Sequence, residues 1–223
     1  MEGFYATADP GVARPLVLVA HAWGGQGEQE RKKAVALAGL GYAGFAADLY
    51  GKGRRGSSAE ENQALMTPLV EDRASIVVGM DAALAAARRL EGVDSAAAAA
   101  IGFCFGGLCV LDLARSGADI AGVVSFHGLF NAPPQPSAGI RAKVLALHGW
   151  DDPMVPPEQV VALAQELTAA GADWQLQAYG NTMHAFTNPG ANDRDFGTVY
   201  DATADQRSWL AMQNFLAELF PPK

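Results

Sequence analysis

The stretch IGFCFGGLCV, residues 101–110, places a cysteine at the centre of a glycine-rich segment. Cys104 stands between two phenylalanines and is bracketed by Gly102, Gly106 and Gly107. Free cysteine is among the most buried residue types and often serves as inert packing. The stretch alone therefore allows two interpretations: a nucleophile held on a tight turn, or a small core residue in a glycine-rich crossover.

The sequence on both sides of this stretch alternates short apolar runs with longer segments of helical pattern. The apolar runs are typical of strands that are covered on both faces, and they span 14–21, 42–50, 96–103, 120–126, 142–149 and 173–179. Helices are expected over 27–41, 71–92, 105–117, 157–170 and 201–219. Strands that alternate with helices predict an α/β protein with a mostly parallel sheet and helices on both faces.

The segment 96–103 is the hardest to assign because its alanine run favours a helix by intrinsic propensity. However, Gly92 ends the preceding helical pattern, and 105–117 has the pattern of a new helix. A central strand with small side chains fits between the two helices better than one long helix does. We therefore expect a strand that leads directly into Cys104.

In a parallel α/β sheet, ligands gather at the carboxyl ends of the strands. A cysteine at this position, with glycines two residues before and two after it, matches the G-x-nucleophile-x-G turn between a strand and a helix. The glycines are needed because neighbouring backbone comes too close for side chains. The N-terminus of the following helix would stabilise a thiolate at Cys104.

The same glycines could belong to a dinucleotide-binding fingerprint, which requires G-x-G-x-x-G and an acidic residue about 20 positions later. Here Cys104 occupies the position of the second glycine, and the next strand ends in VSFHGLF (124–130), without a carboxylate. The sequence therefore disfavours a nucleotide cofactor.

A nucleophile on such a turn needs an acid and then a base, in that chain order, at the ends of later strands. LALHGWDDPMVP (145–156) supplies Asp151 and Asp152, and QAYGNTMHAF (177–186) supplies His184. Neither segment indicates catalysis by itself, since Asp-Asp-Pro is an ordinary turn and a histidine in a loop is common. Three suitable residue types at three strand ends, in order, predict that Cys104 is a nucleophile.

With these motifs in place, the chain resembles the dienelactone hydrolase family of α/β-hydrolases. The resemblance rests on GFCFGG, HGWDDPMVP and MHAF, together with HAWGG (21–25) and ADLYG (47–51), and it spans nearly the whole chain. It implies an α/β-hydrolase fold and the hydrolysis of small esters or lactones, as by a carboxymethylenebutenolidase. No metal or other cofactor is implied.

The resemblance also implies a role for each residue of the motifs. Cys104 would attack the carbonyl carbon, His184 would relay the proton, and Asp152 would orient His184, with Asp151 as a flanking residue. The backbone N–H groups of Trp23 and Phe105 would form the oxyanion hole.

Two positions depart from the family pattern. Ala22 replaces a glutamate that is thought to hold the resting thiol in a neutral state, and Asn188 replaces an arginine that binds the substrate carboxylate. Arg73, Arg54 and Arg55 are candidate substitutes for that arginine. The natural substrate therefore does not carry over with the fold.

Several side chains near the motifs are candidates for the wall of the substrate pocket. His127, at the end of 120–126, lies where the family places an aromatic substrate contact. Phe103, Trp150 and Met183 could wall an apolar acyl pocket, although each could equally belong to the core. His21 is expected to brace the loop that it opens rather than to titrate.

Length and composition limit the remaining choices. The 223 residues, half of them hydrophobic, suit one domain over 1–223 with about seven strands, and the first antiparallel edge strand of related hydrolases is expected to be missing. The net charge of −8 weighs against nucleic acid and anionic membranes as partners.

No apolar run is long enough to span a membrane, and the N-terminus lacks the pattern of a secretory signal. Two cysteines form no disulfide framework or metal motif.

We therefore expect a cytoplasmic hydrolase, a monomer or a weak dimer, whose partner is a small ester or lactone. The alternative is a non-catalytic relative of this fold that binds a small ligand or a protein partner.

Overall fold

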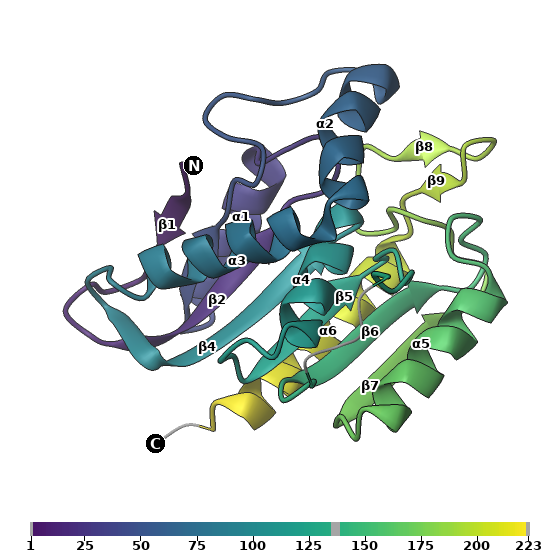
Figure 1. Cartoon of the computed structure of the whole chain (residues 1–223). Helices are drawn as coiled ribbons and strands as arrows, with labels where there is room; N and C mark the ends of the chain where they lie inside the picture. The colour runs from purple at the N-terminus through teal and green to yellow at the C-terminus, as the bar shows by residue number, and fades with distance from the viewer. Residues whose placement is uncertain (1, 135–138, 222–223) are drawn as a thin grey trace.

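A seven-stranded sheet runs through the computed structural model, which describes residues 2–134 and 139–221 (Figure 1). The strand order is β1-β3-β2-β4-β5-β6-β7. All neighbouring pairs are parallel except the pair of β1 and β3. The strands are β1 (Phe4–Ala6), β2 (Arg14–Ala20), β3 (Ala43–Ala46), β4 (Val93–Phe103), β5 (Gly122–Phe126), β6 (Lys143–Gly149) and β7 (Trp174–Tyr179). The predicted α/β class with a mostly parallel sheet of seven strands is confirmed.

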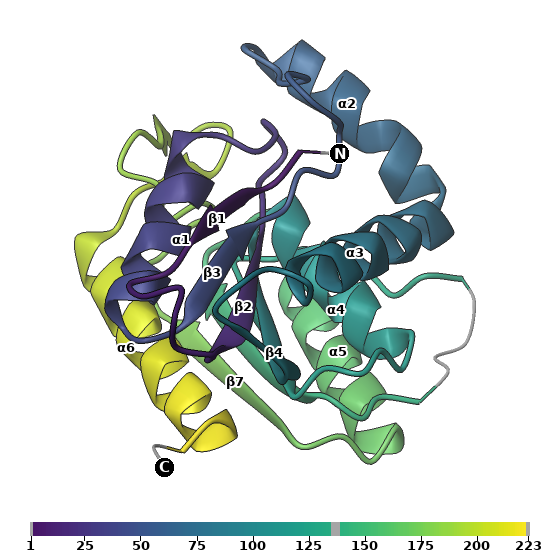
Figure 2. The same cartoon turned by 90° about the vertical axis from the view of Figure 1, so that its left-hand side faces the viewer.

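Helices cover both faces of this sheet, as Figure 2 shows. They are α1 (Glu28–Gly39), α2 (Ala59–Glu71), α3 (Arg73–Ala87), α4 (Phe105–Arg115), α5 (Pro157–Ala169) and α6 (Ala202–Leu219). Helices α1 and α6 lie on one face, and α3, α4 and α5 lie on the other. A small hairpin of β8 (Asn192–Asp193) and β9 (Thr198–Val199) lies at the same end of the molecule as α2. None of the helices in the described residues is long and apolar enough to cross a membrane.

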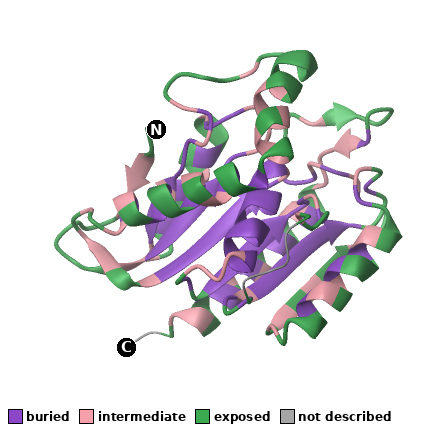
Figure 3. Ribbon diagram, viewed as in Figure 1, coloured by how far each residue is buried: buried purple, intermediate pink, exposed green. Residues whose placement is uncertain are grey.

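The two layers of the core follow from the alternation of side chains along β2. Leu16 and Leu18 belong to the buried layer on the side of α3, α4 and α5, whereas Val17 and Val19 belong to the layer on the side of α1 and α6. All four side chains are fully buried, and Figure 3 shows the central strands as almost continuously buried. Fully burying one such side chain contributes about 1.5–3 kcal/mol. A strand buried on both faces explains why its sequence shows no polar alternation.

The alanine-rich segment is a strand, as predicted from its flanks. β4 pairs in parallel with β2 on one side and with β5 on the other, and Ala98, Ala99 and Ala100 are buried in the sheet. Gly92, with φ of +76°, makes the turn that leads into it. Pairing on both edges and burial outweigh the helix propensity of alanine here.

The region before β4 differs from the prediction. In place of one helix over 71–92, α3 ends at Ala87, and a separate helix α2 precedes it over a segment to which no element was assigned. The break falls at Asp72, whose side chain accepts a hydrogen bond from the N–H of Ser75 and caps α3. A capping carboxylate starts a new helix, so the charges at 71–73 mark a junction and not a helix interior. Of the predicted loop 127–140, residues 135–138 lie outside the described part.

Candidate active site

Cys104 occupies the turn between β4 and α4. It is half-buried, and its backbone has φ of 55° and ψ of −117°. Such angles are unfavourable for a residue with a side chain and cost on the order of 1–3 kcal/mol. The turn keeps this conformation because the strand before it and the helix after it are both buried in the core.

The surrounding glycines allow this turn to form. A Cβ atom on Gly102 would lie 2.0 Å from the carbonyl oxygen of Gly106, and one on Gly106 would lie 2.2 Å from that of Ala20. A Cβ atom on Gly107 would lie 2.6 Å from the Cα of Gly128. The glycines are therefore required by close backbone approach, as the sequence pattern suggested.

Two further strands bring an acid and a base to the same end of the sheet. His184 follows β7, and its Nδ1 lies 2.7 Å from Oδ2 of Asp152, which follows β6. The second oxygen of Asp152 accepts a hydrogen bond of 2.8 Å from the N–H of Met154. Both side chains of the Asp152–His184 pair are buried, whereas the neighbouring Asp151 is exposed. The carboxylate that contacts the imidazole is thus that of Asp152.

The electrostatics of Cys104 and His184 are coupled. Burial raises the pKa of the Cys104 thiol, but the charge and hydrogen bond of His184 outweigh burial, so the pKa lies below its ordinary value. Burial lowers the pKa of His184, but the thiolate of Cys104 and the carboxylate of Asp152 raise it to about 10. The other ring nitrogen of His184, Nε2, is buried and has no hydrogen-bond partner of ordinary geometry among the described residues. Both shifts move the pair toward thiolate and imidazolium.

Two backbone amides also favour a thiolate at Cys104. Hydrogen bonds from the N–H groups of Phe105 and Trp23 contribute to lowering the pKa of Cys104. Phe105 is the first residue of α4, so its N–H belongs to the positive end of the helix dipole. Trp23 lies in the loop after β2. Both N–H groups therefore favour negative charge on the sulfur.

A cavity of about 360 Å³ opens onto Cys104 and His184. Its wall is mainly apolar and includes Trp23, Met66, Phe103, Leu129, Met154 and Phe196. The charged side chains in the wall are Lys33 and Glu30, both from α1. Within the described residues, no group of three His, Cys, Asp or Glu side chains is arranged to hold a metal ion.

Two of the predicted pocket residues line this cavity, namely Phe103 and His127. His127 has a φ of 37°, and its Nε2 lies 2.8 Å from Oγ1 of Thr187. Its ring stands edge-on to that of His184, with 5.1 Å between the ring centroids. Burial, followed by the charge of His184, holds the pKa of His127 well below its usual value, so this imidazole is neutral.

Trp150 and Met183 do not line the cavity, contrary to expectation. Trp150 stands on the turn after β6, and 48% of its surface is exposed. Met183 lies beside the end of β6, where a Cβ atom on Gly149 would be 2.7 Å from the Met183 carbonyl oxygen. Closeness in sequence to Asp152 and His184 misled the prediction, since neighbouring side chains in these turns point in different directions.

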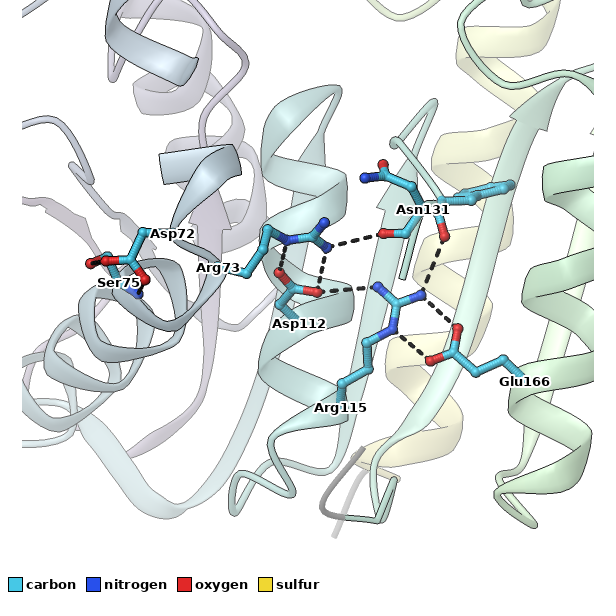
Figure 4. Close-up of polar contacts among 8 residues, drawn as sticks. Asp72, Arg73, Ser75, Asp112, Arg115, Asn131 and Glu166 are labelled. Atoms are coloured by element: carbon cyan, nitrogen blue, oxygen red, sulfur yellow. Dashed lines mark hydrogen bonds and ion pairs between the residues drawn. The ribbon is translucent and has the colours of Figure 1, made fainter. Parts of the chain in front are cut away.

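Arg73 does not reach the cavity either. It begins α3 and is buried, and its Nη2 lies 2.7 Å from Oδ1 of Asp112 on α4 (Figure 4). Asp112 also contacts Arg115, which pairs with Glu166 of α5 at 2.7 Å. An arginine paired in this way is not available to a substrate carboxylate. The expectation that Arg73 is a pocket residue is therefore wrong.

The other two candidate arginines and the two departures from the family pattern have clear positions. Arg54 donates to the carbonyl of Tyr50, and Arg55 donates to Gln26; neither arginine lines the cavity. Ala22 and Asn188 do line it. The amide of Asn188 accepts a hydrogen bond of 2.7 Å from Gln29 of α1. Lys33 places a cation in the cavity wall, but no sequence motif around Lys33 indicated a position in the pocket.

Comparisons with known proteins identify the family and the fold of this chain. The family model described as "Dienelactone hydrolase family" matches residues 1–220. A solved structure named "m3DLH" is 39% identical, covers 98% of this chain and 92% of its own, and has a TM-score of 0.93. A dienelactone hydrolase-like promiscuous phosphotriesterase from metagenomic libraries is 38% identical, covers 97% of this chain and 92% of its own, and has a TM-score of 0.92.

A curated relative from Yersinia pestis, named "Putative carboxymethylenebutenolidase", is 27% identical over 216 residues, which are 92% of this chain and 78% of the relative. The overall likeness to these proteins identifies the fold as the α/β-hydrolase fold.

Proposed function

The chain belongs to the dienelactone hydrolase family, and we propose that it hydrolyses small carboxylic esters or lactones with Cys104 as the nucleophile. In this proposal His184 transfers the protons, and Asp152 orients His184. The observation that carries the proposal is geometric: Cys104 stands at the turn where α4 begins, and His184, whose Nδ1 lies 2.7 Å from Asp152, lines the same cavity.

In the first half of the reaction, the thiolate of Cys104 attacks the carbonyl carbon and forms a C–S bond. The negative charge that develops on the carbonyl oxygen is held by the N–H groups of Phe105 and Trp23. The C–O bond of the ester then breaks, and His184 gives its proton to the departing alkoxide. The product of this half is an alcohol and a thioester on Cys104.

In the second half, neutral His184 removes a proton from a water molecule, whose oxygen attacks the thioester carbonyl. The same two N–H groups hold the oxygen, the C–S bond breaks, and the sulfur leaves as a thiolate beside imidazolium. Asp152 keeps Nδ1 of His184 protonated throughout, so that Nε2 is the atom that exchanges protons.

The cavity supports small and largely apolar acyl groups as substrates. Its volume of about 360 Å³ suits a small molecule, and its wall is mainly aromatic, aliphatic and thioether side chains. Asn188 stands where relatives of the dienelactone type carry an arginine, so strong selection for a substrate carboxylate is not expected at that position.

Phosphotriesters are a second candidate substrate class. The relative that is 38% identical is named a promiscuous phosphotriesterase. Two N–H donors beside a thiolate suit a phosphoryl oxygen as well as a carbonyl oxygen, because both develop negative charge during attack.

The test is an assay of p-nitrophenyl acetate hydrolysis by the wild type, Cys104→Ala and Cys109→Ala. Wild type and Cys109→Ala should hydrolyse the ester at rates within a few-fold of each other, and Cys104→Ala should lose the activity. Equal loss in both variants would point to misfolding, and no activity in the wild type would favour a non-catalytic, ligand-binding relative. Replacing the ester by paraoxon in the same comparison tests the second candidate.

A further inference from the structure

Trp23 lines the same cavity as Cys104, and its N–H, which contributes to lowering the pKa of Cys104, belongs to the peptide unit between Ala22 and Trp23. In a planar trans peptide, the N–H and the carbonyl point in opposite directions across one rigid plane. Whatever holds the Ala22 oxygen therefore also aims the Trp23 N–H. That oxygen lies 2.7 Å from Nδ1 of His21 and accepts a hydrogen bond of 3.1 Å from the N–H of Gly25.

The partners of His21 fix its tautomer. Nδ1 faces the carbonyl oxygen of Ala22, which can only accept, so Nδ1 carries the hydrogen and donates. Nε2 accepts a hydrogen bond of 3.1 Å from the N–H of Leu49, which can only donate. Protonation would set a second N–H against that of Leu49, and burial also lowers the pKa of His21. The imidazole is therefore neutral, with its single hydrogen on Nδ1.

Packing holds the ring of His21 in place beside both oxyanion donors. The ring is fully buried, and its centroid lies 4.6 Å from that of Tyr50 and 6.0 Å from that of Phe105. The hydroxyl of Tyr50 in turn donates to the carbonyl of Trp23 at 3.0 Å. The start of α4 abuts the same backbone, since a Cβ atom on Gly106 would be 2.7 Å from the His21 oxygen.

We propose that His21 is a positioning residue of the oxyanion hole, which it serves by holding the Ala22–Trp23 peptide unit through Nδ1–H. This role rests on the proposed function. The hydrogen bonds run in one direction, from the N–H of Leu49 through the imidazole to the Ala22–Trp23 peptide unit. Each bond strengthens the next, so the Trp23 N–H becomes a better donor when negative charge develops on the substrate oxygen.

Two substitutions distinguish the role of Nδ1 of His21 from that of Nε2. The amide nitrogen of Asn in His21→Asn can occupy the place of Nδ1, whereas the amide of Gln in His21→Gln reaches only the place of Nε2. We expect His21→Asn to keep kcat within a few-fold. We expect His21→Gln to lower kcat by about 10-fold or more with KM little changed, which is less than the 10²–10³-fold that follows removal of an oxyanion donor.

The pH profile of Cys104 alkylation gives a readout that loss of stability would not move. The profile of folded His21→Gln should shift to higher pH because its Trp23 N–H no longer faces the thiolate, and that of His21→Asn should not. Equal loss of kcat in both variants, or no loss in His21→Gln, would overturn the role of His21 alone. Ester hydrolysis that survives Cys104→Ala would instead overturn the proposed function.

The wild type allows the same inference to be tested without any change at His21. Nitrogen-15 NMR of histidine-labelled protein, with 1,1,1-trifluoroacetone as a probe that adds to Cys104, reports on the imidazole directly; the His21→Asn spectrum assigns the signal. We expect a neutral ring with its hydrogen on Nδ1, and a downfield shift of that hydrogen when the adduct forms. A hydrogen on Nε2, or an unchanged shift in the adduct, would contradict the proposal.

Discussion

The N-terminal end of α4 lies next to Cys104 and His184, which line the cavity. The Nε2 of His184 has no hydrogen-bond partner of ordinary geometry within the part of the chain that the structure describes, so this end of the helix leaves room for a substrate. At its C-terminal end, the same helix carries Asp112 and Arg115, which are buried and enclosed by ion pairs to α3 and α5. The helix thus presents unsatisfied polar groups at one end and paired charges at the other.

Cys104, in the turn before α4, and Cys109, within α4, show the same difference five positions apart. The pKa of Cys104 is lowered by His184 and the two amides against the effect of burial. The pKa of Cys109 lies well above its usual value, first because of burial and then because of the charge of Asp112. We therefore expect the reactivity of each thiol to depend on the groups that the fold places beside it, because burial without such groups makes a thiol inert.

The largest effect is expected at the acid of the reactive end. Asp152→Asn should lower kcat by about 10³–10⁴-fold, since the amide no longer enforces the tautomer of His184 or stabilises its charge. Asp151→Asn is the matched control and should stay within a few-fold, because this neighbour is exposed. A comparable loss in both variants, measured with p-nitrophenyl acetate, would remove Asp152 from the mechanism.

At the paired end, the expected effect is on stability. Asp112→Ala leaves two buried arginines without their shared carboxylate and should cost about 3–5 kcal/mol in the free energy of unfolding, measured with urea. Asp119→Asn breaks an exposed pair with Arg88 and should cost no more than about 1 kcal/mol. Equal costs would show that burial of the Asp112 pair has no special weight.

A smaller effect, on the labelling rate of Cys104, is expected from placing a carboxylate beside its thiol. Ala22→Glu should slow iodoacetamide labelling of Cys104 several-fold near neutral pH, because a nearby carboxylate disfavours the thiolate. In the wild type, the lowered pKa means that labelling should already be appreciable well below pH ~8.5, the value for a free cysteine. Ala22→Gln, of similar size without the charge, is the control. Wild-type labelling that rises only above pH ~8.5, or faster labelling in Ala22→Glu, would contradict this account.

The smallest effect is expected at Cys109. This fully buried thiol should remain unlabelled by iodoacetamide in the native protein and react only after unfolding. Peptide mass spectrometry after native and denaturing labelling distinguishes the two cysteines. Native labelling of Cys109 at a rate near that of Cys104 would remove the contrast between them.

The reactive end of α4 could be predicted largely from the sequence because its requirements are local and ordered. The turn at Cys104 needs glycines at fixed offsets, and the acid and base follow strands whose carboxyl ends meet at one edge. The ion pairs at the C-terminal end of α4 could not be predicted from the sequence. Arg73 and Asp112 are 39 positions apart, and neither residue indicates that the other is its partner. An arginine destined for a buried ion pair has the same sequence signature as one in a substrate pocket.

Apart from Phe103 and His127, most of the cavity wall could not be predicted from the sequence. Met66 lies on α2, a helix with no fully buried side chain, so it offers little of the apolar stripe by which helices are recognised. Phe196 and Lys33 come from a hairpin and from α1, which meet only in the folded chain.

The measurement that tests the central claim most directly is mass spectrometry of the protein quenched in acid during turnover of p-nitrophenyl acetate. The account predicts an acetyl group on the peptide that contains Cys104, removed by neutral hydroxylamine as expected of a thioester, and more abundant when Asp152→Asn slows its hydrolysis. Turnover without any acyl group on Cys104, or with a stable acetyl group on another residue that is required for turnover, would contradict it.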